Sequence, residues 1–64
     1  MSVEQQKIVS RLRGLAAEMI ELGMEMQEHG GYSEMALRGL ELVNGGMMVE
    51  TWVKGLGEEA RRGD

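Results

Sequence analysis

The spacing of apolar residues in the first half of the chain constrains the fold more than any other feature. Apolar side chains recur at alternating intervals of four and three residues, which is the heptad pattern of an α-helix with one apolar stripe. We call this stripe the heptad seam, and its six members are Ile8, Leu12, Leu15, Met19, Leu22 and Met26. Val9, Ala16 and Gly23 widen the stripe on one side. The chain contains no proline, so no residue of that type breaks a long helix.

Local signals at both ends set the bounds of this first helix. Ser2 and Gln5 have the spacing of a capping box, in which each side chain satisfies a backbone amide at the start of a helix. The apolar pattern stops at His29, and two glycines follow. Glycine is common just after a helix because it accepts a left-handed backbone at no steric cost. The sequence therefore predicts a helix over residues 3–29.

A second helix is predicted to begin directly after a short link. Ser33 is a good N-cap, and Glu34 then lies at the positive end of the helix dipole. Tyr32 and Leu37 have the spacing of a hydrophobic staple across the cap. This second helix is expected over residues 34–61. A link this short makes the helices antiparallel neighbours, with residue i of the first beside residue 62 − i of the second.

The middle of the second half leaves its conformation open. The apolar residues change from one helical face to another near Asn44-Gly45-Gly46. One interpretation is a helix that continues through these glycines and meets different neighbours with its two faces. A second is a break at Gly45-Gly46 that starts a third helix. A third is a β-hairpin with strands at residues 40–43 and 47–53, because Asn-Gly is a strong hairpin signal.

The size of the chain predicts self-association. Sixty-four residues form a single domain, residues 1–64, whose own hydrophobic core is marginal, and the absence of cysteine removes disulfides as a staple. The predicted fold is therefore an all-α antiparallel helical hairpin assembled as a homo-oligomeric bundle. A second apolar stripe on the first helix, formed by Ala17, Ile20 and Met24, is the expected oligomer contact.

Glycine is unusually frequent for a helical protein, with ten residues in the chain. A glycine inside a helix costs about 0.5–1 kcal/mol relative to alanine. A sequence that retains this cost at several positions indicates close approach to the backbone, either by another helix or by a ligand.

Composition and charge exclude several classes of function. The net charge of −4 argues against direct nucleic-acid binding, and the longest run of apolar side chains, three residues, is too short to span a membrane. No secretory leader is visible, so a cytoplasmic location is expected. The serines and Thr51 lack a histidine and an acidic partner at a recognisable spacing, so an enzyme is not expected, catalytic residues are none and no cofactor is implied.

Acidic residues gather on one stripe of the first helix, which consists of Glu18, Glu21, Glu25 and Glu28. We call it the acidic stripe. It could be a solvated face, or it could dock on a basic protein partner. It could also hold a metal, although Met26 occupies the position where a helical carboxylate site would place the glutamate of an E-x-x-H pair.

Basic residues gather at the open end of the hairpin. The predicted register sets Arg11 near Trp52 and Lys7 near Lys54. An indole can stack on a base and a guanidinium can grip a phosphate with two hydrogen bonds, so these four residues are the candidate ligand site for an anion such as a nucleotide. The alternative is that Trp52 fills the core and the basic groups are solvated.

The second half of the chain resembles a family of small phage proteins. The segment Ser33-Glu-Met-Ala36-Leu37-Arg-Gly-Leu40-Glu41, with a later Met-Met pair and Trp52, is similar to the second helix of helical-hairpin sponges that sequester immune signalling nucleotides. These sponges act in the anti-CBASS and anti-Thoeris systems. The resemblance covers about 20 residues. The inserted Asn44-Gly45-Gly46 and the separation of Met48 from Trp52 depart from it.

This resemblance implies a homo-oligomer that holds its ligand between subunits, inside the host cytoplasm if a phage encodes it. The leading hypothesis is thus a non-enzymatic counter-defence sponge for a nucleotide signal. The alternatives are a small inhibitor or adaptor that docks through the acidic stripe and, less favoured, a helical carboxylate metal-binding protein.

Overall fold

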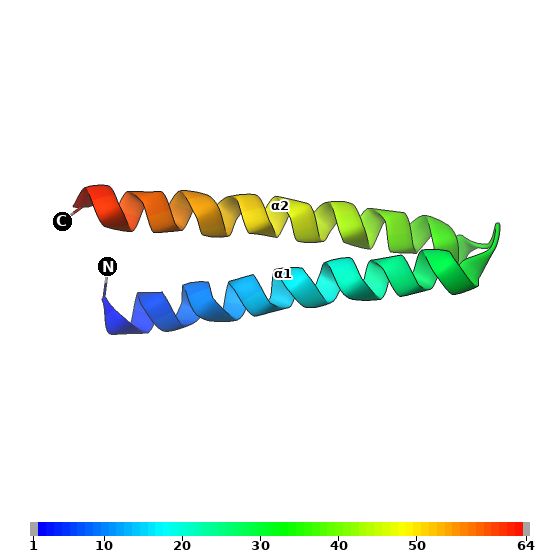
Figure 1. The fold of residues 1–64 in the computed structure, drawn as a ribbon, viewed down its shortest axis with the longest axis horizontal. Helices are drawn as coiled ribbons and strands as arrows, with labels where there is room; N and C mark the ends of the chain where they lie inside the picture. Colours follow the sequence, from blue (N-terminus) through cyan, green and yellow to red (C-terminus); the bar gives the residue numbers. More distant parts are fainter. Residues whose placement is uncertain (1, 64) are drawn as a thin grey trace.

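Two antiparallel helices make up the computed structural model, which describes residues 2–63 and the side chains of residues 2–59. Helix α1 spans Val3–Gly30 and helix α2 spans Glu34–Gly63. Both chain ends lie at one end of the hairpin and the turn lies at the other (Figure 1). The molecule is elongated, with extents of 49 × 16 × 12 Å. The predicted all-α hairpin is confirmed, and each helix ends within two residues of its expected bound.

The ends of α1 form as the sequence indicates. The Ser2 hydroxyl accepts a hydrogen bond from the Gln5 amide, and the Gln5 side chain accepts one from the Ser2 amide, each at 3.1 Å. This is the predicted capping box. At the other end Gly31 has φ 59°, a left-handed conformation that glycine adopts without strain. It reverses the chain toward α2.

The start of α2 differs from the expectation in its side chains. The Ser33 hydroxyl donates to the Gly30 carbonyl oxygen at 2.5 Å, so it caps the end of α1 as α2 begins. The predicted staple between Tyr32 and Leu37 is wrong, because Tyr32 is fully exposed and Leu37 is more than half exposed. The tight reversal at Gly31 leaves Tyr32 projecting from the tip of the hairpin.

Helix α2 continues without a break through Asn44, Gly45 and Gly46. The interpretation of a helix that continues through these glycines is therefore confirmed, and the alternatives of a broken helix and of a β-hairpin are wrong. Packing explains the outcome: a Cβ atom on Gly46 would lie 2.7 Å from Ile20 Cγ1 and 3.0 Å from the Ala16 carbonyl oxygen. The glycines bring α2 against α1 here, and the contacts they permit offset their low helix propensity.

The helices come closest where glycine faces glycine. A Cβ atom on Gly23 would lie 2.6 Å from the Gly39 carbonyl oxygen, and a Cβ atom on Gly39 would lie 2.6 Å from the Gly23 carbonyl oxygen. Residue numbers 23 and 39 add to 62, as do those of Ala16 and Gly46, so the predicted register is confirmed. The contact is between backbones, and no larger residue fits there without separating the helices.

This close approach changes which residues occupy the centre of the interface. The buried apolar side chains are small: Ala16, Val43, Val49 and Val53. The larger residues of the heptad seam lie to one side, where Leu12 and Met19 are half-buried, while Ile8, Leu15 and Leu22 are 57%, 50% and 52% exposed. No large side chain is fully buried among the described residues. The heptad seam therefore flanks the contact between the helices.

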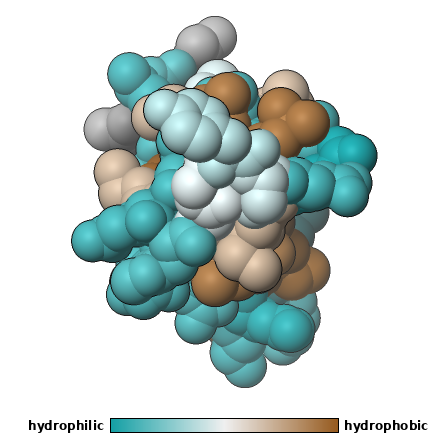
Figure 2. Space-filling view, turned by 90° about the vertical axis from the view of Figure 1, so that its right-hand side faces the viewer, coloured by the Kyte–Doolittle hydropathy of each residue, from teal (hydrophilic) through white to brown (hydrophobic). Residues whose placement is uncertain are grey.

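Apolar side chains consequently reach the surface. Figure 2 looks onto the turn end of the hairpin and shows hydrophobic atoms emerging between hydrophilic ones on more than one side. Neither helix, over the described residues, is apolar for long enough to cross a membrane.

The glycine contact predicts opposite effects for two alanine substitutions. Gly23→Ala is expected to lower the melting temperature, because its methyl group overlaps the Gly39 carbonyl oxygen and overpacking costs about 1–3 kcal/mol. Gly14→Ala is the matched control, because nothing lies within 4 Å of a Cβ atom at that position. It should raise stability by about 0.5–1 kcal/mol through helix propensity. Thermal unfolding followed by circular dichroism at one chain concentration checks both, and a stabilised Gly23→Ala would contradict the packing described.

Candidate functional site

Arg11 lines an open hollow on the outer surface of α1. The other lining residues are Ile8, Leu12, Gly14, Leu15 and Glu18. Four of these six residues are apolar or glycine, and Arg11 and Glu18 carry the opposite charges. The hollow thus offers a cation beside an apolar floor, which suits a ligand with both an anionic and an apolar part.

Trp52 lines a second hollow that adjoins the first. Its walls are Leu12, Gly55, Leu56 and Glu59 together with Trp52, whose side chain is 53% exposed. Leu12 lines both hollows, so the hollow of Arg11 and the hollow of Trp52 meet at this leucine. A half-exposed indole leaves part of its ring available for stacking. Two of the four predicted ligand residues thus line neighbouring hollows, one residue in each.

Lys54 lies in a different hollow, with Arg13, Glu50, Val53 and Gly57. Lys54 is two positions along α2 from Trp52, which places the two side chains about 200° apart around the helix. They thus point to different sides of the helix. A single chain does not arrange Lys54 and Trp52 around one ligand.

Lys7 forms an ion pair within its own helix. Its Nζ lies 3.9 Å from Glu4 Oε1, and both side chains are largely exposed. An exposed pair of this kind contributes little to stability and can open readily. The two arginines near the C-terminus, at positions 61 and 62, lie outside the residues whose side chains the structure describes. A ligand that contacts all four predicted residues would need groups from two chains.

The acidic stripe is exposed along its whole length. Among the described side chains the ion pairs involve Glu4, Glu34 and Glu41, and none involves a member of the stripe. Nor do three His, Asp or Glu side chains come close enough to hold a metal ion within this part of the chain. The stripe is therefore a surface of unneutralised negative charge along α1.

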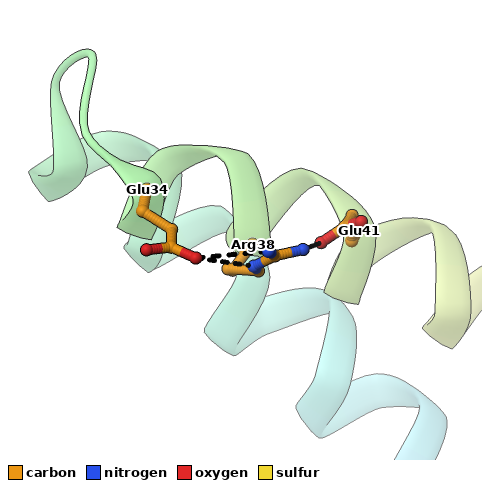
Figure 3. A network of polar contacts seen from close by, with 3 residues as sticks. All are labelled: Glu34, Arg38 and Glu41. Atoms are coloured by element: carbon orange, nitrogen blue, oxygen red, sulfur yellow. Dashed lines mark hydrogen bonds and ion pairs between the residues drawn. The ribbon is translucent and has the colours of Figure 1, made fainter.

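A polar network marks the start of α2 (Figure 3). Arg38 Nη2 donates to Glu34 Oε1 at 3.2 Å, and Arg38 Nη1 donates to Glu41 Oε1 at 2.5 Å. The hydrogen bond to Glu41, followed by that to Glu34, raises the pKa of Arg38 above its usual value. The arginine side chain is exposed, so the network orients side chains on the surface of one helix and contributes little to folding.

The expected close approach at helical glycines is confirmed, but sequence reasoning did not say which small residues set the shape of the hairpin. Ala16 and Gly23 are seven residues apart on α1, and Gly39 and Gly46 are seven apart on α2. Small residues at a heptad interval on both helices are the signal for a close crossing. On α1 these small residues directly follow Leu15 and Leu22 of the heptad seam. The stronger apolar pattern of the seam suggested that the seam itself was the centre of the contact between the helices.

Comparison with known proteins adds no identification. No protein-family model, curated protein or solved structure matches this chain. The functional argument therefore depends on the geometry of the hairpin and on the sequence pattern.

Proposed function

We propose that the chain is a non-enzymatic binding protein that assembles as a homo-oligomer and sequesters a nucleotide-type anion between its subunits. The supporting observation is that Arg11 on α1 and Trp52 on α2 line two hollows that share Leu12. Its chemistry suits a nucleotide, because a guanidinium binds phosphate and an indole face stacks on a base. The resemblance to phage sponges implies the same class of ligand and, if a phage encodes the protein, a location in the host cytoplasm.

The division of basic residues between two hollows supports a site completed by a second subunit. Arg11 and Trp52 serve one side of the hairpin, and Lys54 and Arg13 line a hollow elsewhere. Within one chain each hollow is open to solvent, so it gives a ligand few enclosing contacts. A neighbouring subunit would supply the remaining wall and a second set of positive charges.

Binding is tested by a thermal-shift screen with mono-, di- and cyclic nucleotides. A ligand at 100 times its dissociation constant adds about 2.7 kcal/mol of stability to the folded state. Arg11→Ala should weaken binding by about 1.5–3 kcal/mol, the size of a hydrogen bond to a charged group. Trp52→Leu should weaken it as well and should abolish any change of fluorescence on binding.

Arg38→Ala is the control for Arg11→Ala. It removes the same side chain from the start of α2, outside the hollows of Arg11, Trp52 and Lys54, where its exposed ion pairs contribute little to stability. Full affinity in both Arg11→Ala and Trp52→Leu would exclude this site. Loss of affinity in Lys54→Ala would indicate that the ligand reaches a neighbouring subunit, because Lys54 faces a different side of its own chain.

A second function is favoured by the unneutralised acidic stripe. A small inhibitor or adaptor could dock these four glutamates on a basic protein surface by charge complementarity. The double variant Glu21→Lys, Glu25→Lys should then lose the partner in a pull-down, while its helical circular dichroism is retained because both side chains are exposed. The double variant Glu34→Lys, Glu41→Lys, on α2, is the control. Equal capture by the stripe variant and the native chain would reject this function.

A further inference from the structure

The heptad seam is an incomplete interface in the isolated hairpin. Its six residues have the full pattern of a packed helical stripe, yet the contact with α2 is centred on Ala16 and Gly23 beside it. Ile8, Leu15 and Leu22 recur every seven residues and are each half exposed or more. They form a continuous apolar edge along α1.

The accessible surface of the chain is larger than its mass predicts. It measures 5061 Å², whereas a folded monomer of 7.1 kDa is expected to expose about 4,100 Å². The excess is about 1,000 Å² for each chain, or about 2,000 Å² for a pair. A stable protein interface buries about 1,200–2,000 Å² in total. The excess surface therefore matches the area that one pairing of two hairpins would cover.

The seam is symmetric about its own centre. Its spacings read four, three, four, three, four in either direction. When two seams pack antiparallel, each residue i therefore lies opposite residue 34 − i of the other copy. This antiparallel register pairs Ile8 with Met26, Leu12 with Leu22 and Leu15 with Met19 across a two-fold axis. Every seam residue then has a partner, and a two-fold interface of this kind closes after two copies.

Charge along the edge of the seam favours the same orientation. The edge residues are Glu4, Arg11, Glu18 and Glu25, each seven positions from the next. In the antiparallel register Arg11 of one copy lies opposite residue 23 of the other, within two positions of Glu25. The same register brings Glu18 near its own copy, so two Arg11–Glu25 attractions stand against one repulsion. A parallel pairing would instead place this edge against the Val9, Ala16 and Gly23 edge of the other copy, where Arg11 meets no carboxylate. The basic end of α1 thus complements the acidic end of a second α1.

We propose that the heptad seam of α1 binds the same seam of a second copy, antiparallel and across a two-fold axis. This assignment rests on the proposed homo-oligomer and identifies its contact surface. The second copy then covers the apolar floor of the Arg11 hollow, so a ligand is left the rim of the contact at Arg11 and Trp52. It replaces the Ala17, Ile20 and Met24 stripe as the primary interface, since Ile20 of that stripe already packs against Gly46 within the chain.

Two matched variants test which surface pairs. Leu15 is 50% exposed at the centre of the seam, and Met24 is 58% exposed on the competing stripe. Leu15→Glu should weaken the dimer by about 100-fold or more, because it buries an unpaired carboxylate from each copy. Met24→Glu should leave the dimer within about threefold of the native dissociation constant. Sedimentation equilibrium of the full chain measures both.

The outcomes separate this inference from the proposed function. A native chain that sediments as a folded monomer overturns both the seam pairing and the homo-oligomer. Dimers that survive Leu15→Glu but dissociate in Met24→Glu overturn only the seam pairing. Nucleotide binding is measured separately by thermal shift, so its absence in a seam-paired dimer rejects the ligand and leaves the interface standing.

Single cysteines test the orientation without disturbing the apolar contact. The chain has no native cysteine. In the antiparallel register Glu18→Cys lies about 3 Å along the axis from its own copy, whereas Glu25→Cys lies about 24 Å from its copy, at 1.5 Å per residue. A disulfide requires Cα atoms about 4–7 Å apart. Oxidation should therefore cross-link Glu18→Cys dimers and leave Glu25→Cys unlinked. Cross-linking of Glu25→Cys would contradict this register, and linking of neither variant would overturn the antiparallel seam contact, because a parallel pairing keeps both residues away from their own copies.

Discussion

The backbone contact between Gly23 and Gly39 controls the rest of this structure. Each residue would place a Cβ atom 2.6 Å from the carbonyl oxygen of the other, a distance that no side chain tolerates. The absence of side chains here lets the helices pack along their backbones. A second approach at Ala16 and Gly46, on the same register, keeps them close over two further turns. The turn at Gly31 reverses the chain so that α2 can make this contact with α1.

Close packing determines what the hairpin can bury. Helices that touch along their backbones have room between them only for alanine, glycine and valine, and these are the residues found there. The leucines and methionines are displaced to the flanks, where one side of each faces solvent. A hairpin of this kind hides little apolar surface in proportion to its length, so its stability is low unless something covers the flanks.

The same displacement accounts for the position of the candidate ligand site. Arg11, Leu12 and Trp52 come together on one flank because the centre of the contact excludes them. Lys54 lies elsewhere because two positions along a helix turn a side chain to another side. An apolar flank that carries a cation and an indole can serve association and ligand binding together, with the ligand at the margin of the apolar contact.

The sequence by itself determined the two helices, their bounds within two residues, their antiparallel register and the capping box at Ser2. These follow from local rules, namely heptad spacing, cap chemistry and glycine at the turn, which depend on neighbours a few positions away. The sequence also grouped Arg11 with Trp52, because register alone places them at one level.

Only the tertiary structure decided that α2 continues through Gly45 and Gly46, and that the heptad seam lies beside the helix contact. Both depend on how closely the helices approach, and that distance is set by glycine backbones on two different helices at once. The pattern along one helix shows which side of that helix is apolar, but it does not show how far away the neighbouring helix lies. The physical reason is steric: the smallest residues, which carry the weakest hydropathy signal, determine where two helices can touch.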